Sequence, residues 1–235
     1  MIDSLSVMVE AFAARTPHIE KIAHNLANTH TPGFKAEKTY MRAADQSRQG
    51  GLFYVPAVNI DYTQGNIFRT GNRLDMAIQS DGFFVIETKS GEAYTRKGNF
   101  TVSSANELMT PEGAYVMGEG GRIVLTGSQI VVSDKGEIES ETGTIGKLKI
   151  VRFENPGELV REGSGIYRDP ESKAGLKPQD EPDVKSEHLE NSNVQVLKEM
   201  VEMIDVQRTI ESYQKVIQTL SDLDHLSTNR LGKLM

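Results

Sequence analysis

The five histidines are the first residues to consider for chemistry, because imidazole binds metal ions and exchanges protons near neutral pH. His18, His24 and His30 are spaced six residues apart, whereas two ligands on one helix face need a spacing of three or four. His188 and His225 each lie far from the other histidines in the sequence. We therefore expect surface histidines and no metal site.

The other motifs do not predict catalysis. The glycine-rich run at residues 118–121 lies between apparent strands, whereas a phosphate-binding loop needs a helix N-terminus behind it. No Gly-x-Ser-x-Gly nucleophile elbow is present, and no acidic pair can be placed in a cleft from the sequence. The absence of cysteine excludes disulfides and thiolate metal sites. We expect no enzyme, no catalytic residue and no cofactor.

The strongest helical patterns lie at the two ends of the chain. The pattern at the C-terminal end is the clearer of the two. From Ser192 onward, more than thirty positions contain neither proline nor glycine, which predicts one long helix. Ser192 and Gln195 have the spacing of an N-terminal capping box. Apolar residues recur every seven positions on two neighbouring lines, which is the seam of a helix that faces another helix. These residues are Met203, Ile210 and Ile217 on one line, and Val206, Tyr213 and Leu220 on the other.

A second apolar line (Val194, Leu197, Val201 and Ile204) runs beside this seam over the first turns. One helix cannot bury both lines by itself. The C-terminal helix therefore needs a partner helix from this chain or from a neighbouring subunit.

Residues 2–28 predict a matching N-terminal helix with its own heptad lines. Thr16-Pro17 interrupts it, because a proline inside a helix costs about 3 kcal/mol, although threonine and proline also suit a helix start. The pattern leaves open a kink or two helices that meet at Thr16. It also leaves open whether the chain's ends form a hairpin on their own β domain or pair between subunits. The heptad residues are Ile2, Val9 and Ala23 on one line, and Leu5, Phe12, Ile19 and Leu26 on the other.

The middle of the chain reads as β-structure. Leu74, Met76 and Ile78 alternate with the smaller or polar residues Asp75 and Ala77, and turn signals then recur at intervals of roughly 8–12 residues, which is typical of a sandwich or barrel. The expected fold class is α+β, with long N- and C-terminal helices pairing as a coiled-coil-like layer and an all-β middle domain. The expected divisions are residues 1–34 with 190–235 as the helical domain, 35–73 as a connector, 74–168 as the β domain and 169–189 as a return linker.

Charge and hydropathy exclude several classes of protein. The net charge of −7, without basic clusters, argues against a nucleic-acid partner. No stretch approaches the roughly 20 apolar residues of a membrane helix. Asp3 and Glu10 lie where a signal peptide would have its basic and apolar regions, so we expect a cytoplasmic protein or one exported without signal cleavage.

Several stretches resemble the signatures of flagellar rod and hook proteins. Residues 26–35 (Leu-Ala-Asn-Thr-His-Thr-Pro-Gly-Phe-Lys) resemble the signature that closes the first helix in that family. Residues 81–85 and 94–100 resemble the start of its β domain, and residues 113–118 the hairpin that follows. Residues 192–194 and 199–208 resemble its C-terminal signature. The resemblance covers nearly the whole chain in order, and is greatest to the proximal-rod type, with the distal-rod type as the close alternative.

The resemblance implies a structural subunit of the flagellar basal-body rod, a helically assembled shaft that transmits torque and surrounds the export channel. Its partners would be other copies, other rod proteins and, in transit, the flagellar type III export apparatus, and its location the basal body in the periplasmic space. The alternative is a soluble enzyme or ligand-binding β domain with a helical dimerisation module. The expected assembly interface consists of Leu5, Val9, Phe12, Ile19, Leu26, Asn28, Gly33, Phe34, Val201, Met203, Ile204, Ile210, Tyr213, Ile217 and Leu220.

Overall fold

The structure is a computed structural model that describes residues 16–45, 52–127, 130–141, 143–163 and 165–231. It divides into two compact units. We call the described parts of Met1–Ala27, Glu37–Asn59 and Gln195–Met235 the helical unit, and those of Asn28–Ala36 and Ile60–Val194 the β body.

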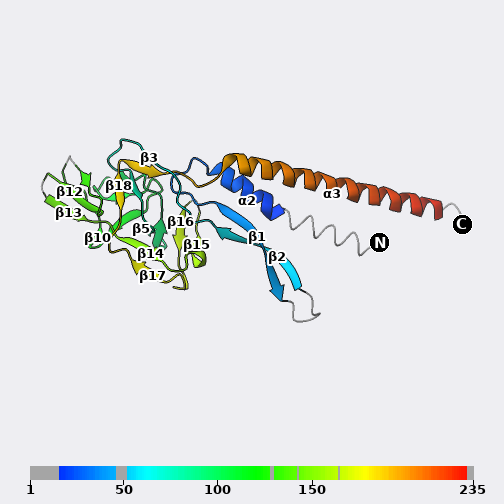
Figure 1. The fold of residues 1–235 in the computed structure, drawn as a ribbon, viewed down its shortest axis with the longest axis horizontal. Helices are drawn as coiled ribbons and strands as arrows, with labels where there is room; N and C mark the ends of the chain where they lie inside the picture. The colour runs from blue at the N-terminus through cyan, green and yellow to red at the C-terminus, as the bar shows by residue number, and fades with distance from the viewer. Residues whose placement is uncertain (1–15, 46–51, 128–129, 142, 164, 232–235) are drawn as a thin grey trace. The chain divides into compact units, whose positions relative to one another are not determined.

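The helical unit contains two helices and a β-hairpin within its described residues. The strands of the hairpin pair only with each other among the described strands. Figure 1 shows α2 alongside the first turns of α3, and α2 also contacts β1. The elements are α2 (Thr16–Ala27), β1 (Glu37–Asp45), β2 (Leu52–Ile60, whose last residue belongs to the β body) and α3 (Val196–Leu231).

The expected fold class, with a long N-terminal helix paired as a coiled coil, is wrong. The described residues contain more strand than helix, and their N-terminal helix, α2, has 12 residues. Its most buried residues, Ile22 and Asn25, lie off both predicted heptad lines, whereas Ala23 on one line is exposed. The reason is that α2 contacts β1 as well as α3, so its buried face is not a two-helix seam. Ile2, Leu5, Val9 and Phe12 lie outside the described residues.

Asn25 shows why the buried face of α2 turns toward the hairpin. Its amide donates to the Glu37 carbonyl and its Oδ1 accepts from the Glu37 N–H, both at 2.8 Å. The first residue of an edge strand thus has both backbone groups paired by one helical side chain, which a buried strand edge requires. A heptad pattern contains no information about such a polar contact.

The long C-terminal helix is confirmed, but its predicted start is not. α3 begins at Val196 and spans 36 residues. The Ser192 hydroxyl accepts from the Val194 N–H at 3.3 Å, in a local turn that precedes the helix. Among the described residues, no helix is long and apolar enough to cross a membrane.

The all-β middle is confirmed, and an antiparallel sheet is its centre. In the part of the chain that the structure describes, this sheet has ten strands in the path β15-β16-β6-β5-β9-β8-β7, with β10, β14 and β17 attached at its side. Its strands are β5 (Phe83–Thr88), β6 (Gly91–Thr95), β7 (Thr101–Val102), β8 (Leu108–Met109), β9 (Tyr115–Gly118), β10 (Gly121–Arg122), β14 (Ile150–Phe153), β15 (Val160–Arg161), β16 (Ile166–Arg168) and β17 (Leu176–Pro178).

Strand β5 is buried on both faces because the sheet carries an apolar core on each side. Phe84 and Ile86 point into the larger core, while Phe83 and Val85 point into a second core that contains both aromatic and aliphatic residues. Alternate residues of a strand face opposite sides, so a continuous apolar run is what a central strand needs here. The short helical turn η1 (Pro156–Glu158) follows β14.

The described residues of the β body also form one sheet of three strands and two sheets of two strands. The three-stranded sheet and one of the two-stranded sheets contribute residues to the larger core. The three-stranded sheet is β11 (Val131–Val132), β12 (Glu137–Ser140) and β13 (Gly143–Lys147). The pairs are β4 (Met76–Ile78) with β18 (Val184–Ser186), and β3 (Ile67–Arg69) with β19 (His188–Glu190). Both pairs join residues more than a hundred positions apart, so they close the β body.

Candidate assembly surface and the junction behind it

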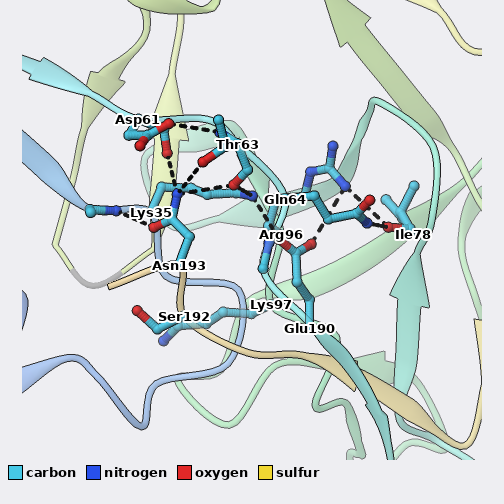
Figure 2. Close-up of polar contacts among 12 residues, drawn as sticks. Lys35, Asp61, Thr63, Gln64, Ile78, Arg96, Lys97, Glu190, Ser192 and Asn193 are labelled. Carbon is cyan, nitrogen blue, oxygen red and sulfur yellow. Dashed lines mark hydrogen bonds and ion pairs between the residues drawn. The ribbon is translucent and has the colours of Figure 1, made fainter. Parts of the chain in front are cut away.

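A buried carboxylate, Glu190, is the centre of a polar junction inside the β body. Its Oε1 accepts from the Lys35 ammonium at 2.7 Å and from the Gly65 N–H at 2.9 Å. The Arg96 guanidinium lies 3.6 Å from its Oε2. Figure 2 shows these side chains converging from segments far apart in the sequence. One carboxylate therefore lies between two cations in a region closed to water.

The two cations are also held by backbone carbonyls. Lys35 donates to the Thr63 carbonyl at 2.8 Å, and Arg96 donates to the carbonyls of Ile78 and Ser80 at 3.2 and 3.1 Å. Burial lowers the pKa of Lys35, an effect that the Glu190 carboxylate opposes. Burial likewise lowers the pKa of Arg96, although a guanidinium stays charged. Charges this deep are tolerated because each lies beside an opposite charge.

Asn193 joins three backbone segments of the same junction. Its Oδ1 accepts from the Ala36 N–H at 2.7 Å, and its amide donates to the carbonyls of Asp61 and Thr63 at 2.7 and 3.0 Å. These backbone groups lie outside any regular sheet, so a side chain must pair them. We call residues 33–36 the incoming segment and residues 190–194 the outgoing segment.

Two glycines let the segments approach closely. Gly33 has a φ of +66°, donates to the Glu190 carbonyl at 2.8 Å, and has no room for a side chain, since a Cβ would lie 2.4 Å from the Arg96 carbonyl carbon. At Gly65, a Cβ would lie 2.0 Å from the Asn191 carbonyl oxygen. Only glycine fits at contacts this short.

Phe34 anchors the incoming segment. It is fully buried and packs with Ala36 and Val194. The Arg161 guanidinium lies over its ring, 4.5 Å from the centroid, and also donates to the Lys35 carbonyl. An aromatic ring covered by a guanidinium gains a cation–π attraction in addition to its burial.

The structure places the predicted interface residues in two groups. Gly33 and Phe34 lie in the junction, and Asn28 lies in the turn after α2, where its carbonyl accepts from the Thr31 N–H at 3.1 Å. The other described residues lie on the two helices. Ile19 and Leu26 are half-buried on α2, and Met203, Ile210, Tyr213, Ile217 and Leu220 are half-buried on α3. Leu5, Val9 and Phe12 lie outside the described residues.

Val194 of the second apolar line is buried, but the three residues of that line on α3 are open to solvent. Leu197 is 81% exposed, Val201 60% and Ile204 49%. Together with Met200, they have the spacing i, i+3, i+4, i+7, which forms one continuous stripe on a helix. We call these four residues the apolar stripe.

Sequence reasoning missed Lys35, Arg96, Glu190 and Asn193 as site residues. Lys35, Arg96 and Asn193 lie inside stretches that carried the family resemblance, and this was the available signal. Their role was hidden because their partners lie on other segments. Among the described residues, no group of three or more histidines, cysteines or acidic residues could hold a metal ion. What the junction can do is hold backbone segments together.

Two family descriptions match the chain. "Flagellar hook protein FlgE/F/G D1 domain" matches residues 77–144, which lie in the β body, and "Flagellar basal body rod FlgEFG protein C-terminal" matches residues 185–230. The second match starts before the outgoing segment and includes most of α3.

Curated relatives match over most of the chain. The chain is 30% identical to a protein named flagellar basal-body rod protein FlgF from Caulobacter vibrioides, over 92% of each sequence. It is 32% identical to FlgF from Salmonella typhimurium, over 85% of this chain and 86% of the relative. It is 30% identical to flagellar basal-body rod protein FlgG from Agrobacterium fabrum, over 97% of this chain and 99% of the relative.

Proposed function

Because the chain belongs to the flagellar basal-body rod proteins of the FlgF and FlgG type, we propose that copies of it assemble through the terminal helices. The chain is a structural rod subunit located in the flagellar basal body, and it associates with other flagellar rod and hook components. The family is not enzymatic, so the enzyme alternative is wrong.

The observation that supports assembly through α3 is the apolar stripe. Leu197, Met200, Val201 and Ile204 lie exposed on one side of α3, whereas the other apolar residues between Val196 and Leu220 are half-buried or buried except Val216. Burying such residues is worth roughly 1.5–3 kcal/mol each, so a long helix exposing them gains much by docking. Its occupant in our proposal is a helix of a neighbouring subunit, which would bring copies together along a shaft.

The remaining predicted interface residues belong to the same proposal. Met203, Ile210, Tyr213, Ile217 and Leu220 on α3, with Ile19 and Leu26 on α2, would complete the surface on which subunits stack. Asn28, Gly33 and Phe34 would set where the helices leave the β body. Leu5, Val9 and Phe12 are proposed to take part from outside the described residues.

A paired charge-insertion experiment tests this proposal. The double variant Val201→Glu with Ile204→Glu should leave the β body folded and abolish rod assembly and swimming, because two carboxylates buried at an interface cost several kcal/mol each. The control, Gln207→Glu with Gln214→Glu, adds the same charge at exposed polar positions of α3 and should swim normally. Normal motility of the first variant would exclude the apolar stripe as an assembly surface.

We further propose that the subunit is exported by the flagellar type III apparatus without signal cleavage. It would then join a periplasmic shaft that transmits torque and surrounds the export channel. Family membership is the support for this step. Purified basal bodies provide the test, because the subunit recovered from them should retain its original N-terminal residues. A shortened N-terminus would contradict the proposal.

A further inference from the structure

Three segments of the β body that connect to the helical unit meet at the Glu190 junction. They are the incoming segment after α2, residues 61–63 after the β1–β2 hairpin, and the outgoing segment before α3. Glu190 binds the first through Lys35, and Asn193 binds the first and second through Ala36, Asp61 and Thr63. The Asp61 N–H also donates to the Ala36 carbonyl at 2.8 Å. Figure 2 shows Lys35, Asp61, Thr63, Glu190 and Asn193 in one cluster.

All of these contacts lie within the β body. Lys35 and Glu190 are almost completely buried, and each finds its charged partner and further hydrogen bonds from the same unit. Opening the junction in a folded β body would leave a carboxylate and two cations with poor hydration and no counter-charge, which is strongly unfavourable. The ion pairs of the junction therefore form without a neighbouring subunit, although Glu190 Oε2 and Arg96 Nε have no hydrogen-bond partner among the described residues.

We propose that this junction is a clamp that is closed in the free subunit and fixes the positions of the end of α2 and the start of α3 before any partner binds. The Lys35–Glu190 pair closes a sequence separation of 155 residues. Gly33 follows the end of α2 by six residues, and Asn193 precedes the start of α3 by three. With such short links, the effective concentration of one helix around the other is on the order of millimolar or higher. In this inference, Glu190 and Asn193 are positioning residues.

The clamp can be tested by hydrogen exchange on the free full-length subunit. The measurement follows three backbone amides whose hydrogen-bond acceptors belong to the junction. They are the N–H groups of Gly33 (to the Glu190 carbonyl), Ala36 (to Asn193 Oδ1) and Gly65 (to Glu190 Oε1). We expect all three to be protected in the free wild-type subunit. Glu190→Gln should reduce the protection of Gly33 and Gly65 by about ten-fold or more, because local opening then no longer breaks an ion pair.

The matched control is Glu187→Gln, three residues earlier. Glu187 accepts from Arg69 at 2.6 Å in an exposed pair, and its removal should leave the three amides unchanged within about two-fold. The Val85 amide, which donates to the Lys149 carbonyl at 3.2 Å in the core sheet, reports whether the β body is still folded. If Glu190→Gln unfolds the body, Asn193→Ala takes its place and should expose Ala36 selectively.

Two results would overturn the clamp. One is rapid exchange of Gly33 and Ala36 in the free wild-type subunit while Val85 stays protected, which would mean that the junction closes only in an assembly. The other is full protection of all three amides in a folded Glu190→Gln or Asn193→Ala variant. Both measurements use the unassembled subunit, so their outcome is independent of the swimming test.

Discussion

At the scale of single residues, Gly33 shows how one backbone position limits a whole junction. Its φ of +66° is a left-handed conformation, and it also lies directly against the backbone of Arg96 and Lys97. The left-handed backbone of Gly33 and the lack of space beside it are therefore two separate reasons why a larger residue does not fit there. Gly71 separates the two effects, because its φ is +78° but a Cβ there would meet nothing within 4 Å.

We therefore predict different costs for alanine at these two glycines. Gly71→Ala should lower the free energy of unfolding by about 1 kcal/mol, the strain of a left-handed alanine. Gly33→Ala should cost about 3 kcal/mol or more, because backbone must also move to admit the Cβ. Urea unfolding followed by circular dichroism measures both. Equal losses would mean that the close approach of Gly33 to Arg96 adds nothing to the strain.

At the scale of elements, the contact between α2 and α3 is polar as well as apolar. His18 Nε2 lies 3.0 Å from a Glu202 carboxylate oxygen, and Lys21 lies 3.0 Å from Glu37 on β1. Glu199 lies in the same region. Burial raises the pKa of Glu199, as does the Glu202 carboxylate, while a hydrogen bond from Asn25 acts in the opposite direction.

This raised pKa predicts the sign of a pH dependence. A carboxyl that binds its proton more tightly in the folded state contributes most below its ordinary pKa of 4.5, and the contribution is lost as pH rises through the raised value. Glu199→Gln should therefore raise the melting temperature of the helical signal at pH 7 and change it little at pH 4. Glu211→Gln, at an exposed position of α3, is the control and should show no such difference. Melting curves followed by circular dichroism at both pH values measure this difference. A lower melting temperature of Glu199→Gln at pH 7 would contradict a raised pKa of Glu199.

At the scale of the whole molecule, the two units have different sources of stability. Both apolar cores and the buried charges of the clamp lie within the β body. Over residues 17–27 of α2 and 196–220 of α3, each helix has one strongly buried aliphatic side chain, Ile22 and Val206. Helices in proteins gain most of their stability from tertiary packing. The helical unit has little packing of its own, so its stability depends more on contacts with other helices than that of the β body does.

This difference predicts that a fragment of residues 28–194 folds alone. It should unfold cooperatively in urea and elute as a monomer, because it contains both cores and every partner of Glu190. Size-exclusion chromatography with light scattering, together with circular dichroism, provides the measurement. An unfolded or aggregated fragment would show that the β body needs the terminal helices.

The sequence alone was sufficient for features that depend on neighbouring residues. A stretch without proline or glycine predicted α3, and turn residues between short apolar runs predicted the β-structure of the middle. The motifs at residues 26–35, 81–85 and 192–194 were sufficient to identify the family. Helix propensity and turn conformation are local properties, so they can be read within a window of a few residues.

Only the tertiary structure decided which groups meet across the chain. The buried face of α2 follows from its two neighbours, α3 and β1, and a heptad pattern assumes just one. Lysine and glutamate usually lie on the protein surface. Lys35 and Glu190 are buried because folding brings them together from positions 155 residues apart in the sequence. The sequence could not predict this pair, because a buried charge is stable only beside a partner that the tertiary fold brings to it.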